Sequence, residues 1–177
     1  MKKNNILIGV TGGIAAYKVA SVVSVLHSKD YNVRVIMTEN STKFITPLTF
    51  SALSHNKVHL DDFTNDGHIC HIELAQWADL FAIVPLTYNT WGKIVSGIAD
   101  NLLTSTVAAW DLKKGSILKF PAMNTKMYEK ISNMDIINVG DSWIKPEVGK
   151  MACGTIGIGK LPSVKTIVKE IEERLNV

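Results

Sequence analysis

The sequence predicts an α/β domain in which helices cover both faces of a parallel sheet. Short apolar runs rich in β-branched residues alternate with segments that carry apolar residues at helical spacing. Such alternation is typical of parallel sheets, whose strands are buried on both faces. The chain has 177 residues, 46% of them hydrophobic, which is enough for a sizeable core. We therefore expect a single Rossmann-like (flavodoxin-like) domain over residues 1–177.

The order of the expected elements follows from these runs. Strands are expected at Ile6–Val10, Val33–Met37, Leu80–Val84, Ile117–Phe120 and Ile136–Val139. Helices are expected near Ile14–Ser28, Thr42–Leu53, Thr90–Ile98 extending towards Trp110, Thr125–Ile131 and Val164–Leu175. The polar stretch Asp61–Cys70 is expected to be a loop. The segment Lys145–Pro162 is rich in glycine and proline, which predicts a mobile loop acting as a lid, or flap.

Composition excludes several classes of function. The net charge is +3, and no basic cluster suggests nucleic acid as a partner. No apolar run approaches the roughly 20 residues of a membrane span. Two cysteines and the absence of an export signal predict reduced thiols and a cytoplasmic protein.

The segment ILIGVTGGIAAYK, at Ile6–Lys18, is the most informative part of the chain. A strand, a glycine turn and a helix follow one another there, which aims backbone N–H groups and a helix N-terminus at a phosphate. The glycines Gly9, Gly12 and Gly13 have GxxGG spacing rather than the GxGxxG of dinucleotide sites. The pattern therefore weakens a nicotinamide dinucleotide interpretation. It leaves open a mononucleotide site or a tight turn that binds nothing.

Polar residues also follow other predicted strands, and parallel strands bring such residues together at the carboxyl edge of the sheet. The residues at one such end are Thr38, Glu39 and Asn40, and those at the next are Thr87, Asn89 and Thr90. Neutral hydrogen-bond partners such as the last three suit a flavin ring, and the same residue types cap helices, so both interpretations stay open.

His71 opens the segment HIELAQWADL, just before a predicted strand. A neutral imidazole there can act as a base near pH 7. The alternative is a histidine that caps a short helix or packs at an interface. His68, Cys70 and His71 match no zinc spacing, so no metal site is predicted.

Asn124 and Cys153 are two further candidates. Asn124 follows an expected strand in PAMNTKM, where its side chain can cap a helix or bind a ligand at the sheet edge. Cys153 lies between glycines in MACGTIGIG, within the expected flap. A thiol is mostly protonated at pH 7, so Cys153 could donate a proton.

Four segments together carry a family resemblance: GVTGGIAAYK, HIELAQWADL, GIADNLLTS and PAMNTKMYE, with MACG after them. The ordered set resembles the homo-oligomeric flavin-containing cysteine decarboxylases, over about Ile6 to Pro162. The resemblance implies a single flavoprotein decarboxylase domain. It also implies FMN-dependent conversion of 4′-phosphopantothenoylcysteine to 4′-phosphopantetheine in coenzyme A biosynthesis. Members of the family form trimers or dodecamers, with flavin and substrate at a subunit interface.

The same resemblance assigns roles to residues. His71 matches the catalytic histidine, Asn124 matches the asparagine that holds the substrate, and Cys153 matches the proton donor of the flap. Gln76 and Tyr128 depart from the family, where Arg and Trp are frequent, and the first departure concerns how the substrate's anionic groups are neutralised. The residues implied for FMN are Gly12, Gly13, Ile14, Thr38, Glu39, Asn40, Thr87, Tyr88, Asn89, Thr90, Ala122 and Met123.

The implied chemistry explains why a flavin is needed. Direct decarboxylation would leave a carbanion with no electron sink, whereas oxidation of the CH₂–SH group to a thioaldehyde lets the electrons delocalise as an enethiolate. The enethiol must then be reduced and protonated. Two alternatives remain: an oxidative decarboxylase of peptidyl C-terminal cysteines, which would stop at the enethiol, and a flavin-binding regulatory protein without catalysis.

Overall fold

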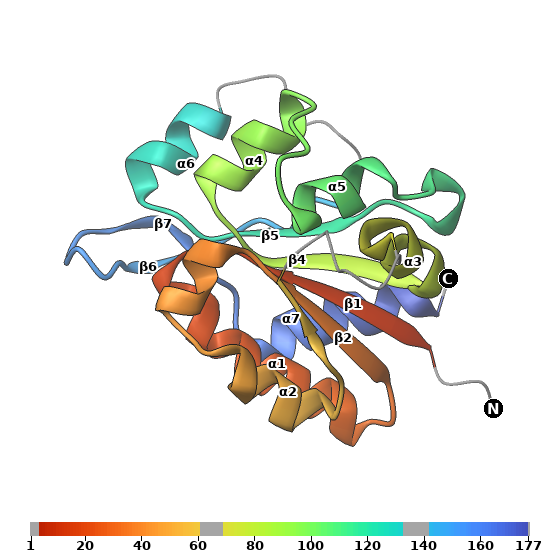
Figure 1. Cartoon of the computed structure of the whole chain (residues 1–177). Coiled ribbons are helices and arrows are strands. Elements are labelled where there is room, and N and C mark those ends of the chain that lie inside the picture. Colours follow the sequence, from red (N-terminus) through yellow and green to blue (C-terminus); the bar gives the residue numbers. More distant parts are fainter. Residues whose placement is uncertain (1–3, 61–68, 133–141, 177) are drawn as a thin grey trace.

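The computed structural model describes residues 4–60, 69–132 and 142–176. Its centre is a parallel sheet of five strands in the order β3-β2-β1-β4-β5 (Figure 1). Strand order reverses between β1 and β4, and ligands of open α/β sheets bind beside such a switch point. The strands are β1 (Asn5–Val10), β2 (Asn32–Met37), β3 (Val58–His59), β4 (Leu80–Leu86) and β5 (Leu118–Pro121).

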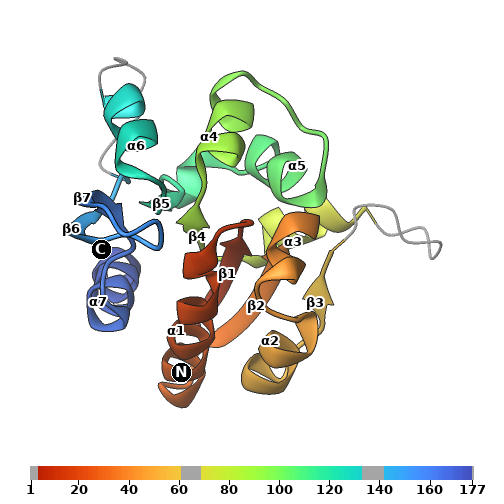
Figure 2. The ribbon, with the colours of Figure 1, turned by 90° about the vertical axis from the view of Figure 1, so that its left-hand side faces the viewer.

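Helices cover both faces of the sheet, as Figure 2 shows. One face carries α1 (Tyr17–Ser28), α2 (Pro47–Ser54) and α7 (Val164–Leu175). The other face carries α3 (Cys70–Trp77), α4 (Tyr88–Val95), α5 (Leu102–Ala108) and α6 (Thr125–Ser132). The short helices are η1 (Ile14–Ala16), η2 (Glu39–Lys43) and η3 (Leu112–Lys114). The expected Rossmann-like class is confirmed. A flavodoxin sheet has the order 2-1-3-4-5, so the likeness to flavodoxin lies in the layers rather than in strand order.

Side-chain alternation along β1 explains the two cores. Ile6, Ile8 and Val10 pack under α1 and α7, whereas Leu7 packs on the opposite face, and all four are fully buried. Each such side chain contributes roughly 1.5–3 kcal/mol when buried. Because both faces are covered, a central strand of this kind must be apolar throughout, as the sequence pattern predicted.

The expected strands and helices agree with the structure except at a few places. The run Ile136–Val139 lies outside the described residues. The helix expected to extend from Thr90 towards Trp110 is two helices, because Gly97, with φ of 68°, interrupts it. Asn101 then starts α5 with a capping box, its side chain accepting a hydrogen bond from the Thr104 N–H at 3.1 Å.

Several elements were not expected. β3 has only two residues, and α3 lies in a segment for which the sequence predicted a loop leading into a strand. Both are too short for periodicity to identify them. The segment Lys145–Pro162 is not a structureless loop: β6 (Glu147–Lys150) and β7 (Ile156–Lys160) pair antiparallel as a hairpin. We call residues 147–160 the flap hairpin.

No helix in the described parts of the chain is long and apolar enough to cross a membrane.

Thr11 ties the ends of β1 and β4 together at the edge where the cavity lies. It is fully buried. Its hydroxyl donates to the Pro85 carbonyl at 2.6 Å and accepts from the Thr87 N–H at 3.0 Å. These bonds hold the start of α4 against the glycine turn.

Replacing Thr11 should therefore destabilise the fold. In Thr11→Val the side chain keeps its shape but leaves two buried backbone groups unsatisfied, which costs about 1–3 kcal/mol in unfolding free energy. Thr42→Val is the matched control, since its hydroxyl makes an exposed bond to the Glu39 carbonyl, and it should cost less than about 0.5 kcal/mol. Urea denaturation measures both, and equal costs would contradict the structural role of Thr11.

Candidate functional site

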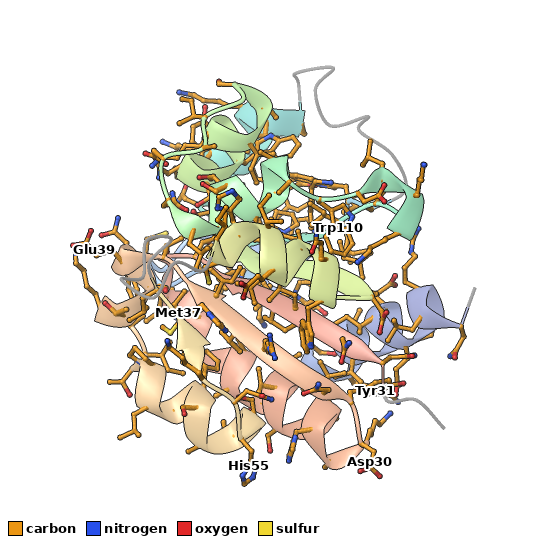
Figure 3. All side chains as sticks on the ribbon, turned by 45° about the vertical axis from the view of Figure 1, so that its right-hand side comes forward. Asp30, Tyr31, Met37, Glu39, His55 and Trp110 are labelled. Carbon is orange, nitrogen blue, oxygen red and sulfur yellow. The ribbon has the colours of Figure 1, made fainter. Side chains whose placement is uncertain are left out.

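A cavity of about 940 Å³ opens at the carboxyl ends of the strands. Figure 3 shows the direction: Met37 and Glu39 lie at one end of β2, and Asp30 and Tyr31 lie at the other. Every residue that the resemblance implied for FMN lines this cavity, and so do Asn124 and Cys153. The walls come from the glycine turn, the segments after β2, β4 and β5, and the flap hairpin.

The glycine turn lies tightly against the segment that follows β2. A Cβ on Gly12 would lie 2.5 Å from the Asn40 Cβ and 2.9 Å from the Asn40 carbonyl carbon, so no side chain fits there. Gly13 is followed by η1 and α1, and the first N–H groups of a helix have no partner within the helix. Gly12, Gly13 and Ile14 line the cavity, and the two glycines present only backbone there. The Gly13 N–H donates to the Thr11 carbonyl at 2.9 Å, so a phosphate would bind other N–H groups of this segment.

Thr87 is the N-cap residue of α4, but its side chain makes no capping hydrogen bond to the helix. Its hydroxyl instead donates to the Thr90 hydroxyl at 3.2 Å. The capping alternative for Thr87 is therefore not what the structure shows. Thr87 to Thr90 place neutral polar groups on the cavity wall, where the ring of a flavin would find donors and acceptors.

The side-chain amide of Asn124 makes two hydrogen bonds, one through its oxygen and one through its nitrogen. Its Oδ1 accepts a hydrogen bond from the Lys126 N–H at 3.0 Å, which caps α6. Its Nδ2 donates to the Cys153 Sγ at 3.3 Å across the cavity wall. The two interpretations of Asn124, cap and site residue, are thus compatible, because the capping bond fixes the direction in which the NH₂ group points.

Cys153 lies in a tight turn at the tip of the flap hairpin. The Gly154 N–H donates to the Met151 carbonyl at 2.9 Å, and Gly154 has φ of 86°, a conformation that favours glycine. The thiol is exposed, 3.0 Å from the Thr155 hydroxyl. Hydrogen bonds with Thr155, and to a smaller extent with Asn124, hold the pKa of Cys153 below its ordinary value.

Two glycines let the flap hairpin lie directly on the turn that carries Asn124. The Met123 N–H donates to the Gly159 carbonyl at 3.0 Å. A Cβ on Gly159 would overlap the Met123 carbonyl oxygen, and a Cβ on Gly157 would overlap the Thr125 hydroxyl. This docking of β7 on residues 123–125 brings Cys153 to Asn124.

His71 does not line the cavity. It lies half-buried in the first turn of α3, and Figures 1 and 2 show α3 well away from the flap hairpin. The preceding residue, Cys70, is buried with its Sγ 3.3 Å from the His59 Nδ1. Burial, Arg34 and Lys57 lower the pKa of His59 to about 4, so that ring is neutral at pH 7.

The two departures from the family also lie off the cavity. Gln76 is exposed on α3, and its carbonyl accepts from the Lys114 Nζ at 2.6 Å. Tyr128 is buried and its ring stacks on Trp143, with centroids 6.5 Å apart. Within the described residues, no group of three or more His, Cys, Asp or Glu side chains could hold a metal ion.

Sequence reasoning missed the charged part of the lining. The cavity is also bordered by Lys18, Lys93, Asp100, Lys150 and Lys160. These residues come from four separate segments, so no spacing connects them. Asp100 belongs to the segment GIADNLLTS, for which the family resemblance implied no role. The Asp100 carboxylate pairs with the Lys93 Nζ at 2.6 Å.

Comparison with known proteins identifies the class. A family model described as Flavoprotein matches residues 1–176, and the chain belongs to this family. The chain is 41% identical over 179 residues to the "Coenzyme A biosynthesis bifunctional protein CoaBC" of Bacillus subtilis (strain 168), which covers 98% of this chain and 43% of that protein. It is 42% identical over 178 residues to a "Probable phosphopantothenoylcysteine decarboxylase" of Streptococcus mutans, with 96% of this chain and 98% of that protein covered. The chain thus spans less than half the length of the bifunctional relative.

Solved structures agree with the fold. A cysteine-to-serine mutant of a PPC decarboxylase complexed with pantothenoylaminoethenethiol superposes with a TM-score of 0.88 at 28% identity, over 99% of this chain and 100% of the other. The FMN-binding protein AtHal3 superposes with a TM-score of 0.80 at 30% identity, over 97% and 96% of the two chains.

The hydrogen bond from Thr155 can be tested through the reactivity of Cys153. Thr155→Val removes the donor, so the pKa of Cys153 should rise and alkylation by iodoacetamide should begin at higher pH. Thr155→Ser keeps the hydroxyl and should restore the original profile. Peptide mass spectrometry separates Cys153 from Cys70. An unchanged midpoint in Thr155→Val would show that the hydroxyl does not act on the thiol.

Proposed function

We propose that this chain catalyses the FMN-dependent decarboxylation of 4′-phosphopantothenoylcysteine to 4′-phosphopantetheine in coenzyme A biosynthesis. The observation that carries the proposal is the contact between Asn124 and Cys153 on the wall of a cavity that the glycine turn also lines. Membership of the flavoprotein family and the names of its relatives agree with this activity.

The residues present fit FMN. Gly12 leaves no space for a side chain beside Asn40, so the turn offers bare backbone to a single phosphate. Thr87 and Thr90 offer neutral hydroxyls, and Ala122 and Met123 add apolar surface for a ring. A volume of about 940 Å³ lies at the upper end of the roughly 300–1,000 Å³ typical of ligand pockets, so a mononucleotide fits.

In the first half of the reaction, the chain must orient the substrate and remove protons. The chemistry that FMN supplies when bound is two-electron oxidation and reduction. The Asn124 Nδ2–H can donate to the substrate's carboxylate, with Oδ1 held in place by the Lys126 N–H. His71 accepts the thiol proton as the substrate becomes a thioaldehyde. Loss of CO₂ then leaves an enethiolate.

In the second half, Cys153 supplies a proton to carbon. The thiol lies on the cavity wall beside Asn124, so the group that orients the substrate also faces the acid. A donor cysteine is needed only when the product is saturated. Its presence supports reductive completion over the oxidative decarboxylation of peptidyl cysteines, and over a regulatory protein without catalysis.

We further propose that the working unit is a homo-oligomer, a trimer or a dodecamer. The cavity holds Asn124 and Cys153 but not His71, so His71 of one copy must reach the cavity of another. Cys70 and Cys153 are thiols outside any disulfide, which supports a reducing, cytoplasmic setting.

The direct experiment is an assay on the purified, FMN-loaded protein. Incubation with 4′-phosphopantothenoylcysteine should release CO₂ and yield 4′-phosphopantetheine, identified by mass spectrometry. Peptides ending in cysteine serve as the comparison substrate. Turnover of the peptides alone would overturn the proposed substrate, and no turnover of either by a yellow, oligomeric protein would overturn the enzyme.

Gly13→Asp should abolish FMN binding. A carboxylate about 4 Å from the phosphate costs about 4 kcal/mol, close to 10³-fold in affinity. Gly92→Asp is the control, because nothing lies within 4 Å of its added Cβ and it does not line the cavity. Fluorescence titration measures both, and tight FMN binding by Gly13→Asp would remove the glycine turn from the site.

Cys153→Ser should release CO₂ but stall before the saturated product. A serine hydroxyl is a far weaker acid than a thiol, so formation of 4′-phosphopantetheine should fall about 10²–10⁴-fold. The enethiol, lighter than the product by the mass of H₂, should accumulate under anaerobic conditions. A normal yield of 4′-phosphopantetheine in a single turnover would refute the role of Cys153 as donor.

A further inference from the structure

We propose that Lys150 and Lys160 of the flap hairpin bind the phosphate group of the substrate. The inference rests on the proposed function and names the part of the same cavity that selects for the phosphorylated form. Both lysines line the cavity. Lys150 ends β6, three residues before Cys153, and Lys160 ends β7.

The side chain of Lys160 lies in the space that a side chain at Gly149 would fill. An added Cβ on Gly149 would lie 2.8 Å from the Lys160 Cδ and 3.5 Å from its Nζ. The aliphatic part of Lys160 therefore lies across Gly149 in the facing strand, which restricts the ammonium group to the hairpin surface. Gly149 in β6 thus allows the side chain of Lys160 in β7 to lie in this direction.

These lysines have no counter-ion in the described parts of the chain. Glu147 lies opposite Lys160 in the strand register, but its carboxylate accepts a hydrogen bond from the Ser163 N–H at 3.0 Å, at the start of α7. By contrast, Lys93 on the same cavity is neutralised by Asp100 at 2.6 Å. The flap hairpin therefore places uncompensated positive charge on the cavity.

FMN and the substrate each carry a phosphate, and we assign the two phosphates to different segments of the cavity wall. The FMN phosphate is assigned to the glycine turn, and the nearest cavity lysine along the chain is Lys18, in the first turn of α1. The substrate reacts at its cysteine end, beside Asn124 and Cys153, and carries its phosphate at the far end of a pantothenoyl chain. The flap hairpin supplies both Cys153 and the two lysines, so it can contact both ends of that molecule.

The test compares two substrates that differ only in this phosphate. kcat/KM is measured for 4′-phosphopantothenoylcysteine and for pantothenoylcysteine, in the FMN-loaded protein and in Lys150→Gln, Lys160→Gln and Lys18→Gln. Each flap variant should lower the ratio of the two kcat/KM values about tenfold, because a hydrogen bond to a charged group is lost. Lys130→Gln is the matched control, because Lys130 is exposed on α6 and does not line the cavity, and it should keep the wild-type ratio.

FMN affinity, measured by fluorescence titration in the same variants, identifies which phosphate is held. Unchanged affinity in Lys150→Gln and Lys160→Gln, with a reduced ratio, supports the proposal. Weaker FMN binding in the flap variants would assign these lysines to the cofactor and overturn it. An unchanged ratio, or an equal fall for both substrates, would also overturn it. Failure of the wild-type protein to convert either substrate would instead refute the proposed function.

Discussion

The site depends on one close contact, the docking of β7 on residues 123–125. Gly157 and Gly159 make it possible, since a Cβ at either position would overlap the facing turn, and overpacking of this kind costs about 1–3 kcal/mol. The hydrogen bond between Asn124 and Cys153 is exposed to water, which competes for both groups, so it adds little to this contact. The packing of backbone on backbone therefore fixes the flap hairpin, and the side-chain contact follows from it.

This docking also explains how distant parts of the chain share one cavity. The sheet edge supplies the glycine turn and the polar residues after β2 and β4, which are rigid because Thr11 joins β1 to β4. The flap hairpin supplies the thiol and the lysines, and it is held through the segment that carries Asn124. The bonds of Thr11 and the docking of β7 involve different residues, so the two parts of the cavity wall are held by separate contacts.

Much of the fold followed from the sequence, for physical reasons. Ile6–Val10 and Val164–Leu175 were predictable because strands buried on both faces and amphipathic helices have distinct periodicities. The turn at Gly12 was predictable because glycines stand between an apolar run and a helical pattern, and the structure adds that Asn40 leaves no space for a side chain there. The flap hairpin was not, since Gly149, Gly157 and Gly159 look like loop residues; here they are needed for close packing in strands.

Site residues were predictable only where they also mark a local structural feature, such as the end of a strand or the start of a helix. Asn124 follows a strand and caps a helix, so its place at the cavity could be expected. The lysines could not be found in this way, because Lys18, Lys150 and Lys160 are adjacent only in the folded chain. His71 shows a further limit of the sequence. It was a candidate catalytic residue, yet it does not line the cavity of the same chain. The catalytic role that we propose for His71 therefore requires a second copy of the chain.

The most direct test of this account mixes two inactive variants. His71→Asn lacks the base and Cys153→Ser lacks the acid, and co-expression with different tags allows mixed oligomers to be isolated. If each site combines His71 of one copy with Cys153 of another, an isolated mixed trimer should form 4′-phosphopantetheine at about a third of its sites, because one of its three interfaces joins the two intact residues. Mixed oligomers that form no more product than the two separate variants would contradict a decarboxylase site completed by His71 from a second copy.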